Sequence, residues 1–276
     1  MQLRFTKMHG LGNDFVVIDL LSQNATLTPQ HIRHIADRHL GIGCDQVLLV
    51  EPPQAPDIDF NYRIFNGDGS EVEQCGNGAR CFGKFVRDKK LSGKRRLAVS
   101  TQGGTITIEI LDDNRVSVDM GSANFSPTAL PFIADTKAEQ YLVAHALGES
   151  SIGAVSIGNP HAIIQVDNID SAPLDTVGVA LATHERFPNG VNVGFMQILS
   201  RSKIALRVLE RGAGETRACG SGACAAVVIG RQQGLLDETV DVALPGGQLR
   251  IHWPEKNSGI TMTGDATKVY DGTIQL

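Results

Sequence analysis

Hydrophobic and polar residues alternate with a period of two along much of the chain, which is typical of β-strands with one buried face. Residues 104–110 read GTITIEI and residues 115–120 read RVSVDM, and the intervening turn Asp112-Asp113-Asn114 predicts a β-hairpin. Further strands are expected at residues 47–50, 59–65, 161–166, 193–199, 204–209, 248–253 and 260–263.

Helical spacing is confined to three shorter segments. Thr28 followed by Pro29 is typical of a helix start and predicts a helix to about residue 38. A second helix is expected from about Gly78, because apolar residues then recur every three or four positions, at Ala79, Phe82, Phe85 and Val86. A third is expected from about Gly222 until Gly234 stops it. Strands dominate, so the pattern predicts an α+β protein rather than a regular βαβ array.

One segment of the sequence occurs twice. Residues 71–81 read EVEQCGNGARC and residues 215–225 read ETRACGSGACA, which places Cys75 and Cys219 144 positions apart. Other pairs recur in the same order at nearly the same spacing: Gly12-Asn13 with Gly158-Asn159, Gln46 with Asn192, and Asn66 with Glu210. Each Gly-Asn pair leads into an apolar strand expected to end at Asp19 or Asp167. The ordered matches predict two duplicated halves, and the alternative is chance in a glycine-rich chain.

Each repeat places a cysteine just before an expected helix. The first N–H groups of a helix have no acceptor within it and carry partial positive charge. We therefore expect the thiol pKa to be lowered from about 8.5 toward neutrality. The glycines allow close approach of a ligand, and the N–H groups of Gly76-Asn77 and Gly220-Ser221 could hold a carboxylate. Two such halves would present two thiols to one cleft between them.

Two thiols around one carboxylate suit inversion of a carbon centre. One thiolate would remove the α-proton from one face, and the other thiol would deliver a proton to the opposite face. No cofactor is needed if fixed dipoles in a dry cleft stabilise the enolate-like charge. The two cysteines must then hold opposite protonation states.

Other readings of the cysteines remain open. A buried cysteine usually behaves as a small hydrophobic residue, and this reading suits Cys81, Cys224 and Cys44. A zinc site would favour C-x₂-C spacing, which the chain lacks, and the same absence weakens a redox function. We therefore expect no metal.

Composition narrows the class of partner. The chain has 276 residues, of which 42% are apolar and 20% charged, and its formal net charge is −5. The negative charge makes nucleic acid an unexpected partner. No segment approaches the roughly 20 apolar residues that span a bilayer, and the start of the chain does not resemble a signal peptide. These features predict a cytoplasmic protein with no membrane partner, and its odd number of cysteines, five, predicts free thiols.

In the two cysteine motifs and in the segments around them, the sequence resembles the diaminopimelate epimerase family. The resemblance runs along essentially the whole chain, through KMHGLGNDFVVID (7–19), GIGCDQ (41–46), FNGDGSEVEQCGNGARC (65–81), GNPHAI (158–163), PNGVNVGF (188–195) and ERGAGETRACGSGA (210–223). It implies two pseudo-symmetric domains, each with strands wrapped around a central helix, and an active site in the cleft between them. The domains would be residues 1–118, completed by 265–276, and residues 119–264. It also implies conversion of LL-diaminopimelate to the meso form, for lysine and peptidoglycan synthesis, with no cofactor.

The resemblance also implies residue roles. Cys75 and Cys219 would transfer the protons, and His161 and Glu210 would adjust the pKa values of those cysteines. The substrate positions would be Asn13, Gln46, Asn66, Gly76, Asn77, Asn159, Asn192, Glu210, Arg211, Gly220 and Ser221. Tyr270 would lie at a homodimer interface.

The chemistry of the proposed substrate suits this set. Diaminopimelate carries a carboxylate and an ammonium at each end, and Arg211 suits the former while Glu210 suits the latter. Simpler readings stay open: Asn13 and Asn159 as turn residues, His161 as a structural histidine, and Glu210 with Arg211 as a weak surface pair. Tyr270 could simply cap the core.

Two other functions compete. A proline or hydroxyproline racemase of the same architecture would use two thiols but would not need the Arg211 and Glu210 clamp. A related isomerase with a carboxylate in place of the first thiol is disfavoured by Cys75. A non-catalytic thiol protein, binding metal or carrying electrons, would show no α-proton exchange, and it leaves the paired motifs unexplained.

Overall fold

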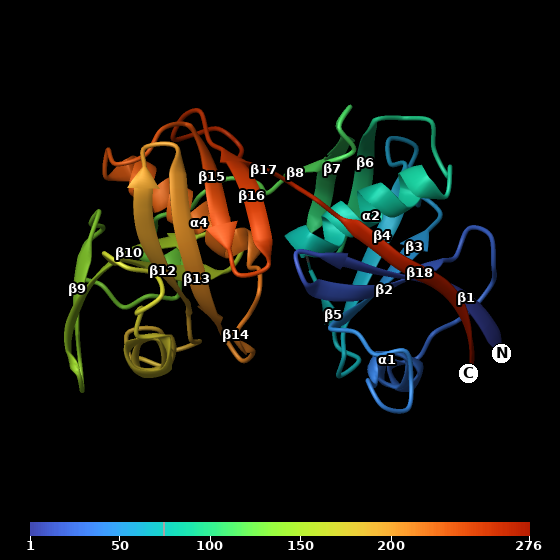
Figure 1. Ribbon diagram of the computed structural model, residues 1–276, viewed down its shortest axis with the longest axis horizontal. Coiled ribbons are helices and arrows are strands. Elements are labelled where there is room, and N and C mark those ends of the chain that lie inside the picture. Colours follow the sequence, from blue (N-terminus) through green and yellow to red (C-terminus); the bar gives the residue numbers. More distant parts are fainter. Residues whose placement is uncertain (74) are drawn as a thin grey trace. The chain divides into compact units, whose positions relative to one another are not determined.

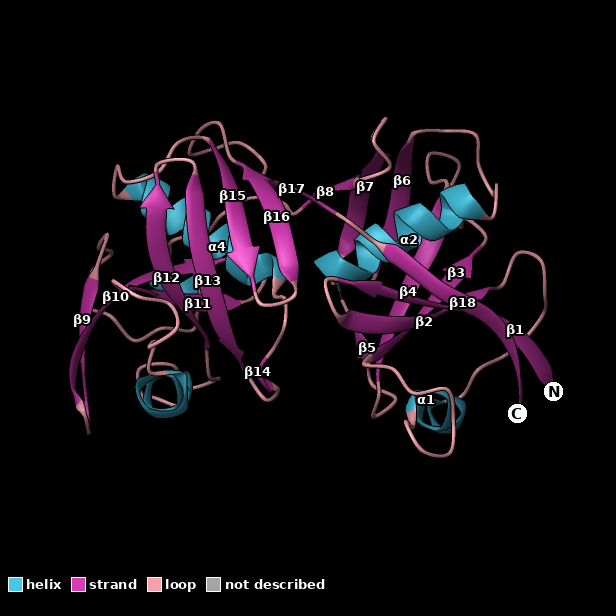
Figure 2. Cartoon of the chain, in the orientation of Figure 1, coloured by secondary structure: helices cyan, strands magenta, loops and turns pink. Residues whose placement is uncertain are grey.

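The computed structural model describes residues 1–73 and 75–276, and strands far outnumber helices in it (Figures 1 and 2). The protein is a mixed α+β fold, as the alternation of hydrophobic residues predicted. Its chain divides into two compact units: unit 1 comprises residues 1–119 and 263–276, and unit 2 comprises residues 120–262.

Unit 1 is built from the first part of the chain and its last strand. It contains β1 (Gln2–Gly10), β2 (Asn13–Asp19), α1 (Pro29–Ala36), β3 (Gln46–Glu51), β4 (Phe60–Asn66), β5 (Glu71–Val72), α2 (Gly76–Asp88), β6 (Arg96–Thr101), β7 (Gly104–Ile110), β8 (Val116–Asp119) and β18 (Thr267–Gln275). Strand β1 is antiparallel to both β18 and β2, and β2 is parallel to β3. Strand β3 is antiparallel to β4, which is parallel to β6, and β6, β7 and β8 follow as antiparallel neighbours.

Helix α2 is the central helix of unit 1, and Figure 1 shows it among the strands of that unit. Its predicted apolar face is confirmed, because Ala79, Phe82, Phe85 and Val86 are all buried. Helix α1 begins as predicted, with Thr28 as N-cap and Pro29 in the first turn. It ends at Ala36, two residues earlier than expected, because the backbone of Asp37 is extended.

Unit 2 contains a second set of strands around a second central helix. Its elements are η1 (Pro127–Ala129), β9 (Tyr141–His145), β10 (Gly148–Ser156), β11 (Pro160–Gln165), η2 (Leu174–Gly178), α3 (Val179–Ala182), β12 (Asn192–Ser200), β13 (Lys203–Glu210), β14 (Gly214–Glu215), α4 (Gly220–Gln232), β15 (Thr239–Leu244) and β16 (Gly247–His252); β17 (Thr261–Gly264) crosses the boundary to unit 1. Helix α4 packs against β10, β11, β12, β13 and β16, and residues 223–229 are almost fully buried.

The two units share one order of strand pairing. In unit 2, β10 is antiparallel to β11, β11 is parallel to β12, and β12 is antiparallel to β13. Strand β13 is then parallel to β15, which is antiparallel to β16. The same sequence of antiparallel and parallel contacts links β1, β2, β3, β4, β6 and β7 in unit 1. In each unit the central helix follows a two-residue strand, β5 or β14.

Most expected strands are present, and the hairpin at residues 104–120 is formed by β7 and β8. Several boundaries differ from the sequence analysis. Helices α2 and α4 begin at Gly76 and Gly220, two residues earlier than expected, and the preceding cysteines occupy the N-cap positions; of the two, Cys75 accepts a capping hydrogen bond, from the Gly78 N–H. Strand β11 ends at Gln165, so Asp167 lies beyond the strand rather than at its end.

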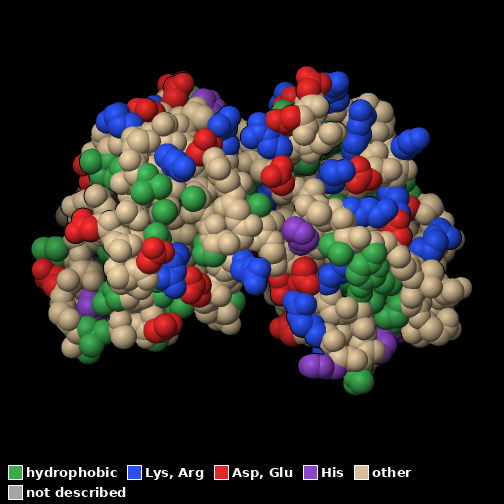
Figure 3. Space-filling model, viewed as in Figure 1, with side chains coloured by type: hydrophobic (Ala, Val, Ile, Leu, Met, Phe, Trp, Pro, Cys, Tyr) green, Lys and Arg blue, Asp and Glu red, His purple; other side chains and the backbone are tan. Residues whose placement is uncertain are grey.

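Among the residues described, no helix combines the length and apolar character that a membrane crossing requires. Acidic and basic side chains are interspersed on the visible face of each unit (Figure 3).

Candidate active site

Cys75 occupies the N-cap of helix α2, where the chain turns from strand β5 into the helix. Its backbone is extended, with φ −143° and ψ 115°, and its Sγ accepts the N–H of Gly78 at 3.5 Å. The side chain is partly exposed. The Oδ1 atom of Asn13 lies 3.9 Å from the same sulfur. The sulfur of Cys75 therefore has a hydrogen-bond donor, the Gly78 N–H, and a hydrogen-bond acceptor, Asn13 Oδ1, beside it.

The predicted polar residues of unit 1 lie at one end of three neighbouring strands. Asn13 and Gln46 begin the parallel strands β2 and β3, and Asn66 ends the antiparallel strand β4. Gln46 and Asn66 are register partners, and Gln46 Nε2 donates to Asn66 Oδ1 at 2.9 Å. Asn77 Nδ2 donates to Asn13 Oδ1 at 3.2 Å, which connects the first turn of α2 to this end of the sheet.

Tyr62 packs against Gly78 in the first turn of α2, and the sequence analysis did not single it out. Its side chain is buried, and no partner for its hydroxyl is found among the described residues. Burial raises its pKa well above the usual value, and the nearby Cys75 and Cys81 add to that rise. A Cβ atom at Gly78 would collide with the Tyr62 hydroxyl, which explains the glycine in this first turn.

Cys219 occupies the N-cap of helix α4, and its environment differs from that of Cys75. Only 4% of Cys219 is exposed. Burial raises the thiol pKa well above its usual value, and the Glu210 carboxylate raises it further. The hydroxyl of Ser221, 3.6 Å from Sγ, and the Gly222 N–H act in the opposite direction but are outweighed. The expectation of a lowered thiol pKa is therefore wrong for Cys219, because desolvation exceeds the effect of the helix start.

His161 links the start of strand β11 to the start of helix α4. It is completely buried, and its Nε2 lies 3.0 Å from both Asn159 Oδ1 and Ser221 Oγ. Burial lowers its pKa to about 3, with the charge of Arg211 as a second cause. His161 is therefore neutral at physiological pH. A proton on Nε2 satisfies the Asn159 oxygen, and we assign that tautomer on this hydrogen bond.

The remaining predicted residues of unit 2 lie at the end of β13 or contact it. Glu210 accepts a hydrogen bond from the Thr216 hydroxyl, another residue that the sequence analysis missed. Asn192 donates to the Pro160 carbonyl at 3.1 Å and accepts the backbone N–H of Arg211 at 2.8 Å.

Arg211 itself is exposed, and its Nη1 donates to the Asn189 carbonyl at 2.8 Å. The described residues show no ion pair between Arg211 and Glu210. The simpler reading of these two residues as a surface pair is therefore not supported.

Gly76 and Gly220 are the first residues of their helices, with Asn77 and Ser221 next. Each unit thus places a cysteine beside the N–H groups of a helix start, which is an arrangement that can bind a carboxylate. The reading of the other thiols as buried hydrophobic residues is confirmed. Cys44, Cys81 and Cys224 are buried, and burial raises the pKa of both Cys44 and Cys81 to about 12.

Tyr270 is not part of either cysteine environment. It lies on β18 opposite Lys7, is 45% exposed, and packs edge-on against Phe5 with ring centroids 5.8 Å apart.

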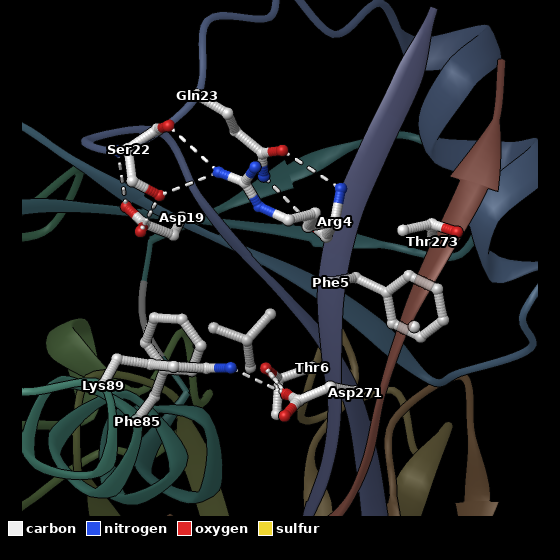
Figure 4. Close-up of a pocket in the computed structure, with 12 residues that line it drawn as sticks. Arg4, Phe5, Thr6, Asp19, Ser22, Gln23, Phe85, Lys89, Asp271 and Thr273 are labelled. Atoms are coloured by element: carbon white, nitrogen blue, oxygen red, sulfur yellow. Dashed lines mark hydrogen bonds and ion pairs between the residues drawn. The ribbon is translucent and has the colours of Figure 1, made fainter.

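A cavity of about 450 Å³ in unit 1 is likewise separate from the predicted residues, none of which is among the described residues that line it. Figure 4 shows its polar side chains paired with one another: Lys89 and Thr6 both bind Asp271, and Arg4 binds Ser22. We interpret it as a structural junction between β18, β1 and the end of α2.

Solved structures show the same fold at low sequence identity. A phenazine biosynthesis protein of the PhzF family from Bacillus anthracis has a TM-score of 0.71 at 15% identity, with 100% of both chains covered. A hydroxyproline epimerase from Agrobacterium vitis, with bound trans-4-hydroxy-L-proline, has a TM-score of 0.71 at 14% identity, over 99% of this chain and 92% of that chain. A methylitaconate Δ-isomerase has a TM-score of 0.64 at 13% identity, over 99% of this chain and 95% of that chain. The fold is thus one shared by epimerases and isomerases.

The sequence gives a more specific assignment. Residues 5–126 and 153–269 match the family described as diaminopimelate epimerase. The chain belongs to this family and is an enzyme of the isomerase and epimerase type.

Proposed function

We propose that the protein converts LL-2,6-diaminopimelate to meso-diaminopimelate without a cofactor, with Cys75 and Cys219 as the two proton-transfer residues. One observation carries this proposal. Both units place a cysteine at the N-cap of a 13-residue helix that follows the same order of strand pairings, in a chain of the diaminopimelate epimerase family.

The proposal includes a duplicated architecture. The halves would be residues 1–118 with 265–276, and residues 119–264, with the substrate bound in a cleft between them. The shared order of strand pairing supports this origin. The chemistry then requires that one α-carbon be reached by both cysteines, one from each face.

The environments of the two cysteines differ, and we assign them opposite protonation states. Cys219 is held as a thiol by burial and by Glu210, so it carries the proton to be delivered. We assign the thiolate to Cys75, which is partly exposed and accepts the Gly78 N–H. In one turnover Cys75 gains the α-proton and Cys219 loses one, so the protein keeps its total number of protons. The same steps in reverse restore the original stereochemistry.

The remaining groups would bind the two ends of the substrate. The N–H groups at Gly76 and at Gly220-Ser221 would hold the reacting carboxylate. Arg211 and Glu210 would bind the distal carboxylate and an ammonium, with the asparagines and Gln46 as further polar contacts. Product formation would serve lysine and peptidoglycan synthesis, and Tyr270, exposed on β18, would lie at a homodimer interface.

Racemisation of proline or hydroxyproline is the second candidate. The fold likeness to the hydroxyproline epimerase keeps it in consideration. A cyclic substrate with a single carboxylate would leave the exposed Arg211 without a role, which favours diaminopimelate.

The decisive experiment is proton NMR of reduced protein in D₂O, with LL-diaminopimelate and proline in parallel samples. We expect the meso isomer to appear with deuterium at one α-carbon, and no exchange on proline. Exchange on proline alone would keep the two-thiol chemistry and replace the substrate. Absence of exchange on both would overturn the proposed function.

A further inference from the structure

Two asparagines beside Cys75 belong to a chain of hydrogen bonds that runs from a buried cation to a surface anion. Arg80 Nη2 donates to Asn77 Oδ1 at 2.8 Å, and Asn77 Nδ2 donates to Asn13 Oδ1 at 3.2 Å. Asn13 Nδ2 donates to Asp45 Oδ2 at 2.9 Å. The other oxygen of that carboxylate accepts from Arg38 Nη2 at 2.7 Å.

The charged ends of this chain fix the orientation of both amides. The oxygen and nitrogen of a carboxamide are nearly equal in size, so packing alone does not decide which way the group faces. A guanidinium only donates, so Asn77 must turn its oxygen toward Arg80. A carboxylate only accepts, so Asn13 must turn its nitrogen toward Asp45. The nitrogen of Asn77 then meets the oxygen of Asn13, which completes the chain.

The orientation of Asn13 matters because this residue contacts the reactive sulfur. Its Oδ1 lies 3.9 Å from Cys75 Sγ. If the amide turned over, a donor would replace this acceptor beside the cysteine, and the group presented to a bound substrate would change in the same way. The hydrogen-bond chain therefore determines what the active site offers at this point.

Arg80 is completely buried in the first part of helix α2. It has no exposed surface although it carries a charge, and a buried charge is costly unless it is well hydrogen-bonded. Besides Asn77 it binds the Gly76 carbonyl at 3.4 Å and the Asp265 carbonyl at 3.3 Å. These contacts hold the guanidinium between the first turn of α2 and the segment that leads into β18.

We propose that Arg80 is a positioning residue of the active site, which acts through Asn77 to fix the orientation of Asn13 at Cys75, with Asp45 as the opposite anchor. The inference rests on the proposed function of Cys75. It assigns roles to two residues, Arg80 and Asp45, that the sequence analysis did not single out.

Side-chain amide NMR tests this chain of hydrogen bonds by a measurement that does not depend on catalytic activity. The variants are Arg80→Met, which keeps the volume, and Asp45→Ala at the exposed end, with Val86→Ala as a control on the same helix. We expect Arg80→Met to shift the amide signals of Asn13, and Asp45→Ala to shift those of Asn77, although neither pair is in direct contact. Val86→Ala should leave both asparagines unchanged. If each substitution moves only the signals of its direct partner, the proposal is overturned.

Kinetics test the consequence for the reaction. We expect Arg80→Met to lower kcat about tenfold to a hundredfold with a smaller change in KM, because a misplaced group costs rate rather than affinity. Arg80→Lys should recover part of the loss, since it restores a cationic donor. The double variant with Asp45→Ala should be no slower than Arg80→Met alone, because both substitutions break one chain.

Two kinetic results would contradict the proposal. One is a double variant whose loss equals the product of the single losses. The other is an Arg80→Met loss no larger than that of Val86→Ala when both are equally destabilised in thermal unfolding. If the unmodified protein exchanges no α-proton, the proposed function fails, while the NMR experiment still decides whether the chain orients the two asparagines.

Discussion

The starts of helices α2 and α4 are equivalent in topology but different in chemistry. In unit 1 the Asn77 and Asn13 amides bind each other directly, and charged residues anchor both ends. In unit 2 the equivalent Ser221 and Asn159 are connected through His161, which is neutral. Register places Phe15, opposite Gln46, where unit 2 has His161, opposite Asn192.

The difference extends to the cysteines themselves. Cys75 is partly exposed beside an N–H donor, whereas Cys219 is buried beside a carboxylate. The two-base reaction proposed above needs one thiolate and one thiol at a time, and its reverse exchanges the two roles. The comparison teaches that two units with the same order of strand pairing can hold a cysteine at the same place in each while neighbouring side chains give it a different environment.

The largest expected effect comes from removal of either thiol. Cys75→Ala and Cys219→Ala should each lower the epimerisation rate by at least about 10³-fold, because general acid–base catalysis is lost at one face of the carbon. Deuterium exchange and meso-isomer formation are the measurements. Cys224→Ala, which removes a buried thiol one turn into α4, serves as the control and should stay active. A near-normal rate in either of the first two variants would refute the two-base assignment.

The second prediction concerns the carboxylate beside Cys219. Glu210 raises the Cys219 pKa, so Glu210→Gln should lower it, and alkylation of Cys219 should begin at lower pH. The measurement is the pH dependence of alkylation in a Cys75→Ala background. Glu215→Gln, a charge loss in the same strand pair that is bound to Arg207, is the matched control. Equal alkylation profiles for the two glutamine variants would count against the role of Glu210.

A smaller effect should appear in stability at acid pH. The His161 pKa is lowered to about 3 in the folded state from 6.5, so the unfolded chain takes up a proton below pH 6.5 and the folded protein does not. Stability therefore falls as pH falls, by about 2 kcal/mol from this residue between pH 6.5 and pH 5. His161→Gln should make the decline in unfolding free energy shallower by that amount. An unchanged slope in His161→Gln would disprove the assignment.

An effect of similar size should distinguish the two helix starts by their packing. Gly78→Ala should destabilise the protein by about 1–3 kcal/mol, because the new methyl group collides with the Tyr62 hydroxyl. Adding Tyr62→Phe should restore most of that loss. At Gly222 the added Cβ would meet Val208 at 3.0 Å and Cys219 at 3.2 Å, so Gly222→Ala should cost less. Thermal unfolding gives all three values, and a lack of rescue by Tyr62→Phe would show that the collision is not the cause.

Signals from residues close together in the sequence were sufficient to predict many of the helices and strands. The Thr28-Pro29 helix start, the hairpin and the two cysteine-capped helices depend on neighbouring residues, and the structure contains them all. The positions of the paired motifs were also available, because the repeat is visible as a spacing.

The rest depends on contacts between residues far apart in the chain. Arg80 looks like an ordinary surface arginine on a helix, and its burial depends partly on the carbonyl of Asp265. The Cys219 pKa could not be predicted from the helix start alone, because burial and the carboxylate at the end of β13 decide it. Tyr62 lies outside the quoted motifs, and Thr216 lies within the repeat without a signal of its own role; the fold places both beside the site.

Because unit 1 includes strand β18, the two units are completed at different times during synthesis. It pairs along the length of β1, so unit 1 is assembled from the first and the last segments of the chain. On the ribosome, β1 must wait with one edge unpaired until β18 emerges, whereas unit 2 is continuous and can fold earlier. The half that carries Cys219 would therefore reach its final form before the half that carries Cys75, which β18 completes.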